Sequence, residues 1–138
     1  MDAQPVRLLL IHGSIVLLSG LLSGIPFWIA IISRRDEDTV RPWRVAHTTL
    51  ITCGLVMLTV GVINPHLSLS EGLRSLLVWA FVVSGYGFVF ALVVGAGTGY
   101  RALIPKPFSI INTLLFMGHL IGAVGAVLGM CIVLFGLL

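Results

Sequence analysis

Residues 41–54 read RPWRVAHTTLITCG, and within this stretch a charged segment is followed by a long apolar one. Residues 34–41 include three arginines and three acidic residues, whereas residues 45–63 contain no aspartate, glutamate, lysine or arginine. An imidazole just inside such an apolar run costs free energy unless a partner satisfies its polar atoms. His47 therefore needs a hydrogen-bond partner or a ligand.

The composition of the whole chain is that of a membrane protein. Of its 138 residues, 58% are hydrophobic and only 9% are charged, and the mean hydropathy is +1.13. Soluble domains carry about 25% charged residues, so this chain has too few charges to cover a water-facing surface. No basic cluster alternates with aromatic residues, so the net charge of +3 gives no reason to expect nucleic-acid binding.

Four apolar runs are long enough to cross a bilayer, at residues 6–32, 45–63, 73–96 and 108–138. In lipid such runs form helices, because the backbone must satisfy its own hydrogen bonds. Short connections make neighbouring helices antiparallel. The sequence thus predicts one all-α transmembrane domain over residues 1–138. We expect an integral membrane four-helix bundle, up-down-up-down, with both termini on the same side.

The orientation of this bundle is predicted from the basic residues of its short loops. Loops 33–44 and 97–107 hold six of them, and the opposite side holds two. We therefore expect these two loops to be cytoplasmic and both termini to lie outside, in a bacterial-type cytoplasmic membrane. The six residues are Arg34, Arg35, Arg41, Arg44, Arg101 and Lys106, and the other two are Arg7 and Arg74.

Small residues recur at four-residue spacing in three of the predicted spans, which allows helix backbones to approach closely. Two interpretations stay open: an interface between copies of the chain, or packing within one bundle. The residues are Gly20 and Gly24, Gly87, Ala91 and Gly95, Gly118 and Gly122, and Gly125 and Gly129.

Three of the four histidines lie inside predicted spans, and His66 lies in a loop, where we expect a solvated side chain. His47 lies a few ångströms from the cytoplasmic end of its span. By helix rise, His119 lies about 16 Å from the same face and His12 about 9 Å from the opposite one. A haem with two histidine ligands would need His12 and His119, whereas a haem with one ligand near the cytoplasmic face needs only His47.

His47 has two interpretations. It is a neutral imidazole bonded to a backbone carbonyl or to a hydroxyl, or it is an axial ligand of haem iron. In the second case nearby guanidinium groups would pair with the haem propionates, besides setting the topology. The hydroxyl candidates are Thr48, Thr52, Ser14 and Ser19, and the propionate candidates are Arg44, Arg41, Arg35 and Arg34.

The predicted spans contain no carboxylate, which argues against a proton-coupled transporter and against a metal site with oxygen ligands. No serine–histidine–acid set and no nucleotide-binding loop is present. A bound Lewis-acidic cofactor would therefore supply chemistry that the side chains lack.

Three segments of the chain, taken in order, resemble the styrene oxide isomerase family. They are His12-Gly13 followed by Leu21, Leu22, Gly24 and Trp28; Trp43-x-x-Ala46-His47 with Gly54 seven residues on; and Gly85-Tyr86-Gly87-x-Val89. The resemblance implies a homotrimer with haem b between subunits and with the histidine matching His47 as the iron ligand. Ferric iron then acts as a Lewis acid on a small hydrophobic epoxide. Ring opening and a hydride shift give a carbonyl compound, without net redox change.

The chain departs from this family in the expected substrate pocket. Cys53 stands six residues after His47, where the family has an asparagine. Ser84, Phe88 and Leu92 stand where the family has polar residues, including a tyrosine. We expect these four residues, together with Phe90, to line an apolar pocket.

Two alternatives from other classes remain. The first is a membrane haem protein without isomerase chemistry, which would be a sensor, a carrier or an electron-transfer unit with His119 as the suspected second ligand. The second is a small membrane protein without a cofactor, whose histidines bond internally.

Overall fold

The computed structural model describes residues 4–100, 104 and 108–138. It contains α1 (Gln4–Ile32), α2 (Glu37–Ile63), the short η1 (Asn64–His66), α3 (Glu71–Val89) and α5 (Ile110–Leu137). Between α3 and α5, the chain continues through a π-helical turn, η2 (Phe90–Val94), into α4 (Gly95–Thr98). No strand occurs in these described ranges. Four helical segments are long and apolar enough to cross a membrane, so the predicted all-α four-span fold is confirmed.

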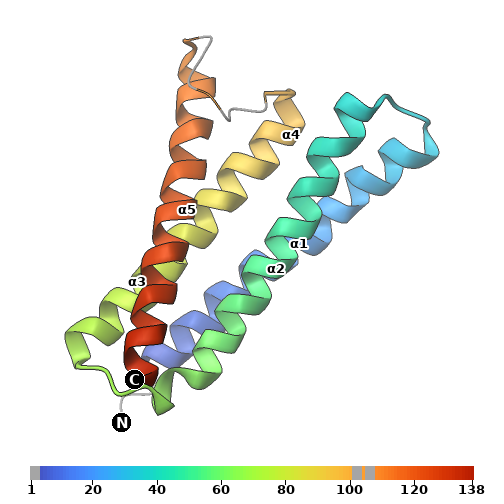
Figure 1. The fold of residues 1–138 in the computed structure, drawn as a ribbon. Helices are drawn as coiled ribbons and strands as arrows, with labels where there is room; N and C mark the ends of the chain where they lie inside the picture. The colour runs from blue at the N-terminus through green and yellow to red at the C-terminus, as the bar shows by residue number, and fades with distance from the viewer. Residues whose placement is uncertain (1–3, 101–103, 105–107) are drawn as a thin grey trace.

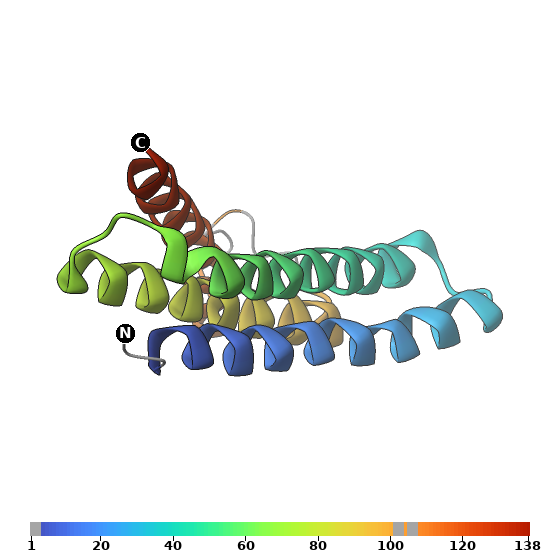
Figure 2. The ribbon, with the colours of Figure 1, turned by 90° about the horizontal axis from the view of Figure 1, so that it is seen from below.

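The helices form two antiparallel hairpins, α1 with α2 and α3 with α5 (Figure 1). The start of α1 and the end of α5 lie at the same end of the bundle, as predicted. The hairpins lie close together at this end and diverge toward the end that carries the loop after α1. Seen along the perpendicular direction in Figure 2, α1 and α2 run side by side over their whole lengths.

Side-chain caps fix where three of the helices begin. Asp36 accepts a hydrogen bond from the backbone N–H of Thr39 and so caps α2. Glu37 and Asp38 in its first turn also favour the positive end of the helix dipole. The helix therefore begins eight residues before the predicted apolar run, within the charged segment. Ser70 and Ser109 cap α3 and α5 in the same way.

The turn after α2 is held by hydrogen bonds from the guanidinium group of Arg74, which we call the Arg74 clamp. Arg74 donates to the side-chain oxygen of Asn64 at 2.7 Å, to the Asn64 carbonyl, and to the Leu67 carbonyl at 3.0 Å. These oxygens lie in the turn just after the end of α2, where the Asn64 and Leu67 carbonyls also accept hydrogen bonds from the backbone N–H groups of Leu67 and Leu69. The Arg74 clamp thus joins the start of α3 to the end of α2.

Glycines bring the helices of each hairpin into backbone contact. A Cβ atom at Gly20 would lie 2.6 Å from the Ile51 nitrogen, and one at Gly87 would lie 2.9 Å from the Gly118 carbonyl oxygen. A Cβ at Gly122 would lie 2.8 Å from the ring of Phe88. The small residues at these positions therefore pack within one chain. The predicted close approach is confirmed, and for these glycines it is intramolecular.

Candidate functional site

His47 lies on the face of α2 that packs against α1. Its Nδ1 lies 2.9 Å from the carbonyl oxygen of Gly20. Since a carbonyl can only accept, Nδ1 carries the hydrogen and donates it, and in the neutral ring Nε2 keeps its lone pair. No hydrogen bond within the described residues engages Nε2. The imidazole thus has one nitrogen anchored and the other free to act as a ligand.

Three residues of α1 fix the orientation of this ring. They are Gly20, Gly24 and Phe27, which share one face of α1 at helical spacing. A Cβ atom at Gly24 would lie 2.9 Å from both Cε1 and Nδ1 of His47, so only glycine leaves room for the ring there. The Phe27 ring lies 6.0 Å from the imidazole, centroid to centroid. Neither Gly20 nor Phe27 was singled out as a partner of His47 from the sequence.

The hydroxyl partners suggested by sequence proximity were wrong. Thr48 and Thr52 on α2 donate to carbonyls of their own helix, four residues back, and Ser14 and Ser19 on α1 do the same. This local bond is the usual one for serine and threonine in helices, and in an apolar span it occupies the hydroxyl. The carbonyl alternative was correct, but the carbonyl belongs to the neighbouring helix.

The metal-ligating side chains near His47 suit haem iron better than a bare metal ion. Among the described residues, no group of three or more histidine, cysteine, aspartate or glutamate side chains could hold an ion. A macrocycle provides four nitrogen ligands itself and needs only an axial imidazole from the protein. A ligating histidine usually donates a hydrogen bond from its second ring nitrogen to a carbonyl or carboxylate oxygen, as Nδ1 of His47 does to Gly20. The residues present therefore fit an axial ligand site.

Arg44 lies one turn before His47, on the same side of α2. Its guanidinium is 5.9 Å from the centroid of the Phe27 ring, which also contacts His47. Two N–H groups of Arg44 donate to the two carboxylate oxygens of Glu37, at 3.1 and 3.4 Å. Arg44 is thus already in two-point contact with a carboxylate, that of Glu37, which lies ten residues before His47 on the same helix. Both partners are exposed, so the pair itself adds little stability.

The other predicted propionate partners are placed differently. Arg34 and Arg35 are exposed in the loop after α1, and Arg34 has a left-handed backbone with φ of 49°. Arg41 lies on the side of α2 that faces the second hairpin. Arg101 and Lys106, which the topology prediction used, lie outside the described residues.

Arg41 borders a cleft of about 150 Å³ where the two hairpins diverge. The cleft also contains Leu92 of η2 and His119 of α5. Nδ1 of His119 is bonded to the Leu115 carbonyl of its own helix at 2.9 Å. A π-helical turn such as η2 often marks a functional site. The structure therefore brings Arg41, Leu92 and His119 together, but apart from the contacts of His47.

Within the part of the chain that the structure describes, the expected substrate-pocket residues lie in different surroundings. Cys53, Phe88 and Leu92 pack against the hydrophobic core. Ser84 is buried, and its hydroxyl donates to the Gly122 carbonyl at 2.6 Å. Phe90 instead lines a groove on the other side of α3, beside His12. Their contact with a substrate stays a prediction.

His12 and His119 border different hollows of the bundle. Nδ1 of His12 is 2.9 Å from the hydroxyl of Tyr86, across the α1–α3 contact. The described contacts of neither histidine include His47. His66 is exposed after α2, as expected for a loop residue.

Four apolar helices and an anchored imidazole in the second of them define a multi-pass membrane protein with a candidate axial-ligand site. The family model of styrene oxide isomerase matches residues 6–138, so the chain belongs to this family. No curated protein and no solved structure matches the chain.

Proposed function

We propose that the protein binds haem b through His47 and isomerises a small hydrophobic epoxide to a carbonyl compound. Two findings support this proposal: membership of the styrene oxide isomerase family and the geometry of His47. The hydrogen bond to Gly20 is the observation that carries it. It fixes the tautomer in which Nε2 can bind iron, and it raises the basicity of that nitrogen.

The residues around His47 have distinct parts in this proposal. His47 holds the iron, Gly20 and Gly24 set the plane of the ring, and Arg44 holds a propionate beside it. Haem bound in this way supplies a Lewis-acidic iron for the oxygen of an epoxide. The apolar spans would keep water from the reacting carbon, so that isomerisation is favoured over hydrolysis.

A second protomer would complete the site. His47 is half-buried at the contact of two helices, and a single helical hairpin offers too little surface to enclose a macrocycle. We propose a homotrimer with haem b between subunits, in the cytoplasmic membrane, with loops 33–44 and 97–107 facing the cytoplasm. The exposed apolar side chains around the bundle are compatible with contacts to lipid and to further copies.

The test is the absorption spectrum of the purified protein beside that of two variants, His47→Ala and His66→Ala. We expect a Soret band for the parent and for His66→Ala, because His66 is exposed in a turn and contacts no predicted site residue. His47→Ala should lose or shift the band, and added imidazole should restore it by entering the vacated position.

Activity is measured on the same samples with styrene oxide, by following the aldehyde product. The proposal predicts turnover that depends on haem content and is absent from His47→Ala. A parent protein without a Soret band after growth with added haem contradicts the cofactor. A Soret band without any isomerisation contradicts the reaction only.

A further inference from the structure

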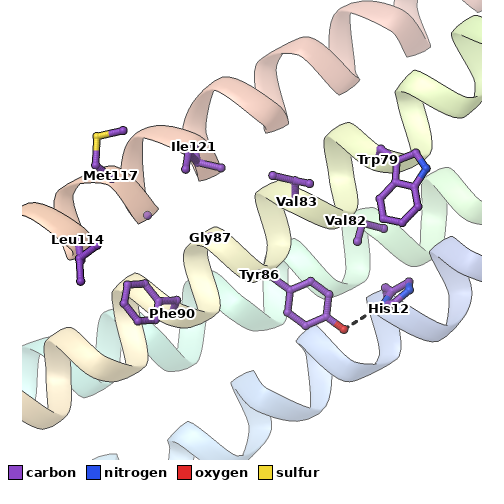
Figure 3. Close-up of a pocket in the computed structure, with 11 residues that line it drawn as sticks. His12, Trp79, Val82, Val83, Tyr86, Gly87, Phe90, Leu114, Met117 and Ile121 are labelled. Atoms are coloured by element: carbon purple, nitrogen blue, oxygen red, sulfur yellow. Dashed lines mark hydrogen bonds between the residues drawn. The ribbon is translucent and has the colours of Figure 1, made fainter.

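A groove on the outer side of α3 combines an apolar lining with one polar pair. It has a volume of about 710 Å³, within the range of small-molecule sites. Helix α3 forms its floor, α5 one flank and His12 of α1 the other (Figure 3). We refer to it as the His12 groove. Its principal lining residues are His12, Trp79, Tyr86, Phe90, Met117 and Ile121.

The polar pair always leaves one hydrogen-bond donor unused. Neutral His12 has one N–H and Tyr86 has one O–H, which makes two donors, and the bond between them uses one. If Tyr86 donates to Nδ1, the N–H at Nε2 of His12 stays free. If Nδ1 donates to Tyr86, the phenol O–H stays free. The count is the same for either tautomer.

This free donor lies among apolar surroundings at the depth of the membrane. His12 is six residues into the span that begins at Val6, about 9 Å by helix rise. The other principal lining residues of the groove carry no hydrogen-bond acceptor except the thioether of Met117 and the hydroxyl of Tyr86. An unsatisfied donor is costly where no water is present, so an acceptor oxygen brought by a ligand would be favoured.

We propose that the His12 groove binds a small apolar aromatic ketone from the membrane beside the rings of Trp79 and Phe90, with its oxygen accepting a hydrogen bond from the His12–Tyr86 pair. An apolar helix of a second copy fits less well, because its backbone acceptors are already used and it would bury the donor without a partner. The site lies apart from the contacts of His47 and does not depend on haem.

Photolabelling with benzophenone tests this site directly, because benzophenone is itself an aryl ketone and its excited state reacts readily with methionine. Met117 lines the groove, and Met130 lies on the same helix outside it. Their side chains are 43% and 42% exposed, so equal labelling is expected from exposure alone. The full-length protein in lipid nanodiscs is irradiated, and the labelled residues are quantified by mass spectrometry.

We expect labelling of Met117 to exceed that of Met130 several-fold. Acetophenone should compete, whereas α-methylstyrene, which has the same shape without the oxygen, should compete about three- to tenfold less well, since one hydrogen bond separates them. The double variant His12→Leu/Tyr86→Phe removes both donors and keeps the groove apolar. In it, both the labelling preference and the difference between competitors should disappear.

Three results would overturn the proposal. Equal labelling of Met117 and Met130 would mean simple partition into lipid. Weaker labelling of Met117 would mean that a second copy covers the groove. Equal competition by acetophenone and α-methylstyrene would mean that the polar pair recognises no oxygen. Helical circular dichroism of each variant, and the haem spectrum, are recorded in parallel and report on folding and on the separate His47 site.

Discussion

The imidazole of His47 donates from Nδ1 to the carbonyl oxygen of Gly20 across the α1–α2 contact, at 2.9 Å. This bond joins two residues 27 positions apart, and it fixes which ring nitrogen is free. It also satisfies the imidazole of His47 inside an apolar span, where no hydroxyl group among the described residues bonds to it. In the proposed function, the same bond prepares Nε2 as a ligand.

Gly24→Ala should weaken haem binding without removing the ligand. The added Cβ would lie 2.9 Å from the His47 ring and force it to turn, which breaks the bond to Gly20. Loss of such a supporting contact typically costs about 10- to 100-fold in metal affinity. The measurement is haem transfer to apomyoglobin. Gly72→Ala is the matched control, because a Cβ there meets nothing within 4 Å. Equal transfer rates for the two variants would contradict the role of the ring orientation.

Arg44→Lys and Glu37→Gln should act in opposite directions on haem retention. Lysine keeps the charge but cannot make the two-point contact, so the first variant should lose haem faster. Glu37→Gln removes the carboxylate that Arg44 contacts at 3.1 Å, so the guanidinium becomes available to a propionate and retention should rise. Haem content and dissociation rate are measured for both. A loss of haem in Glu37→Gln would show that the ion pair, not free Arg44, supports the site.

Ser84→Ala should lower stability modestly and leave activity unchanged. The buried hydroxyl donates to the Gly122 carbonyl at 2.6 Å, and losing such a bond costs about 1 kcal/mol. Unfolding in sodium dodecyl sulfate, followed by circular dichroism, gives the change in free energy. Ser75→Ala on the exposed side of α3 should show almost none. If Ser84→Ala abolishes turnover at normal stability, Ser84 contacts substrate, as the sequence comparison with the family predicts.

The start of α2 should loosen in acid. Hydrogen bonds from Thr39, chiefly from its hydroxyl, hold the pKa of Asp36 below its ordinary value of 3.8. A lowered pKa in the folded state means that the cap stabilises the helix above that ordinary value and is lost as pH falls through the folded pKa. The protection factors of the Thr39 and Val40 amides against hydrogen exchange should therefore fall as the pH falls through the folded-state pKa of Asp36. In Asp36→Asn, which caps without titrating, this pH dependence should vanish.

Much of the architecture could be predicted because membrane spans are encoded locally. Length and apolarity predict each helix, and short loops predict antiparallel neighbours. The least accurate boundary was that of α2, which begins at Glu37 because Asp36 caps it within a charged segment. The predicted glycine contacts were also correct, but the sequence left open whether they join one chain or two.

The candidate site could be predicted only as a set of residue types. His47 was evident, because an imidazole in an apolar run stands out in any sequence. Its partner was not, since Thr48, Ser14 and the Gly20 carbonyl were all compatible with the sequence and only the rotation of α1 against α2 selects among them. The same holds for His12 and Tyr86, which are 74 positions apart.

The sequence by itself determined that the chain has four helices long and apolar enough to cross a membrane, with its charged side chains near or beyond the ends of these helices. Lipid imposes both, since every backbone group must be satisfied within a helix and every charge must remain near a surface. The tertiary structure decided which polar atoms meet and which stay free. That choice depends on interhelical distances set by single glycines, such as Gly20 and Gly24, and so on contacts that no local pattern encodes.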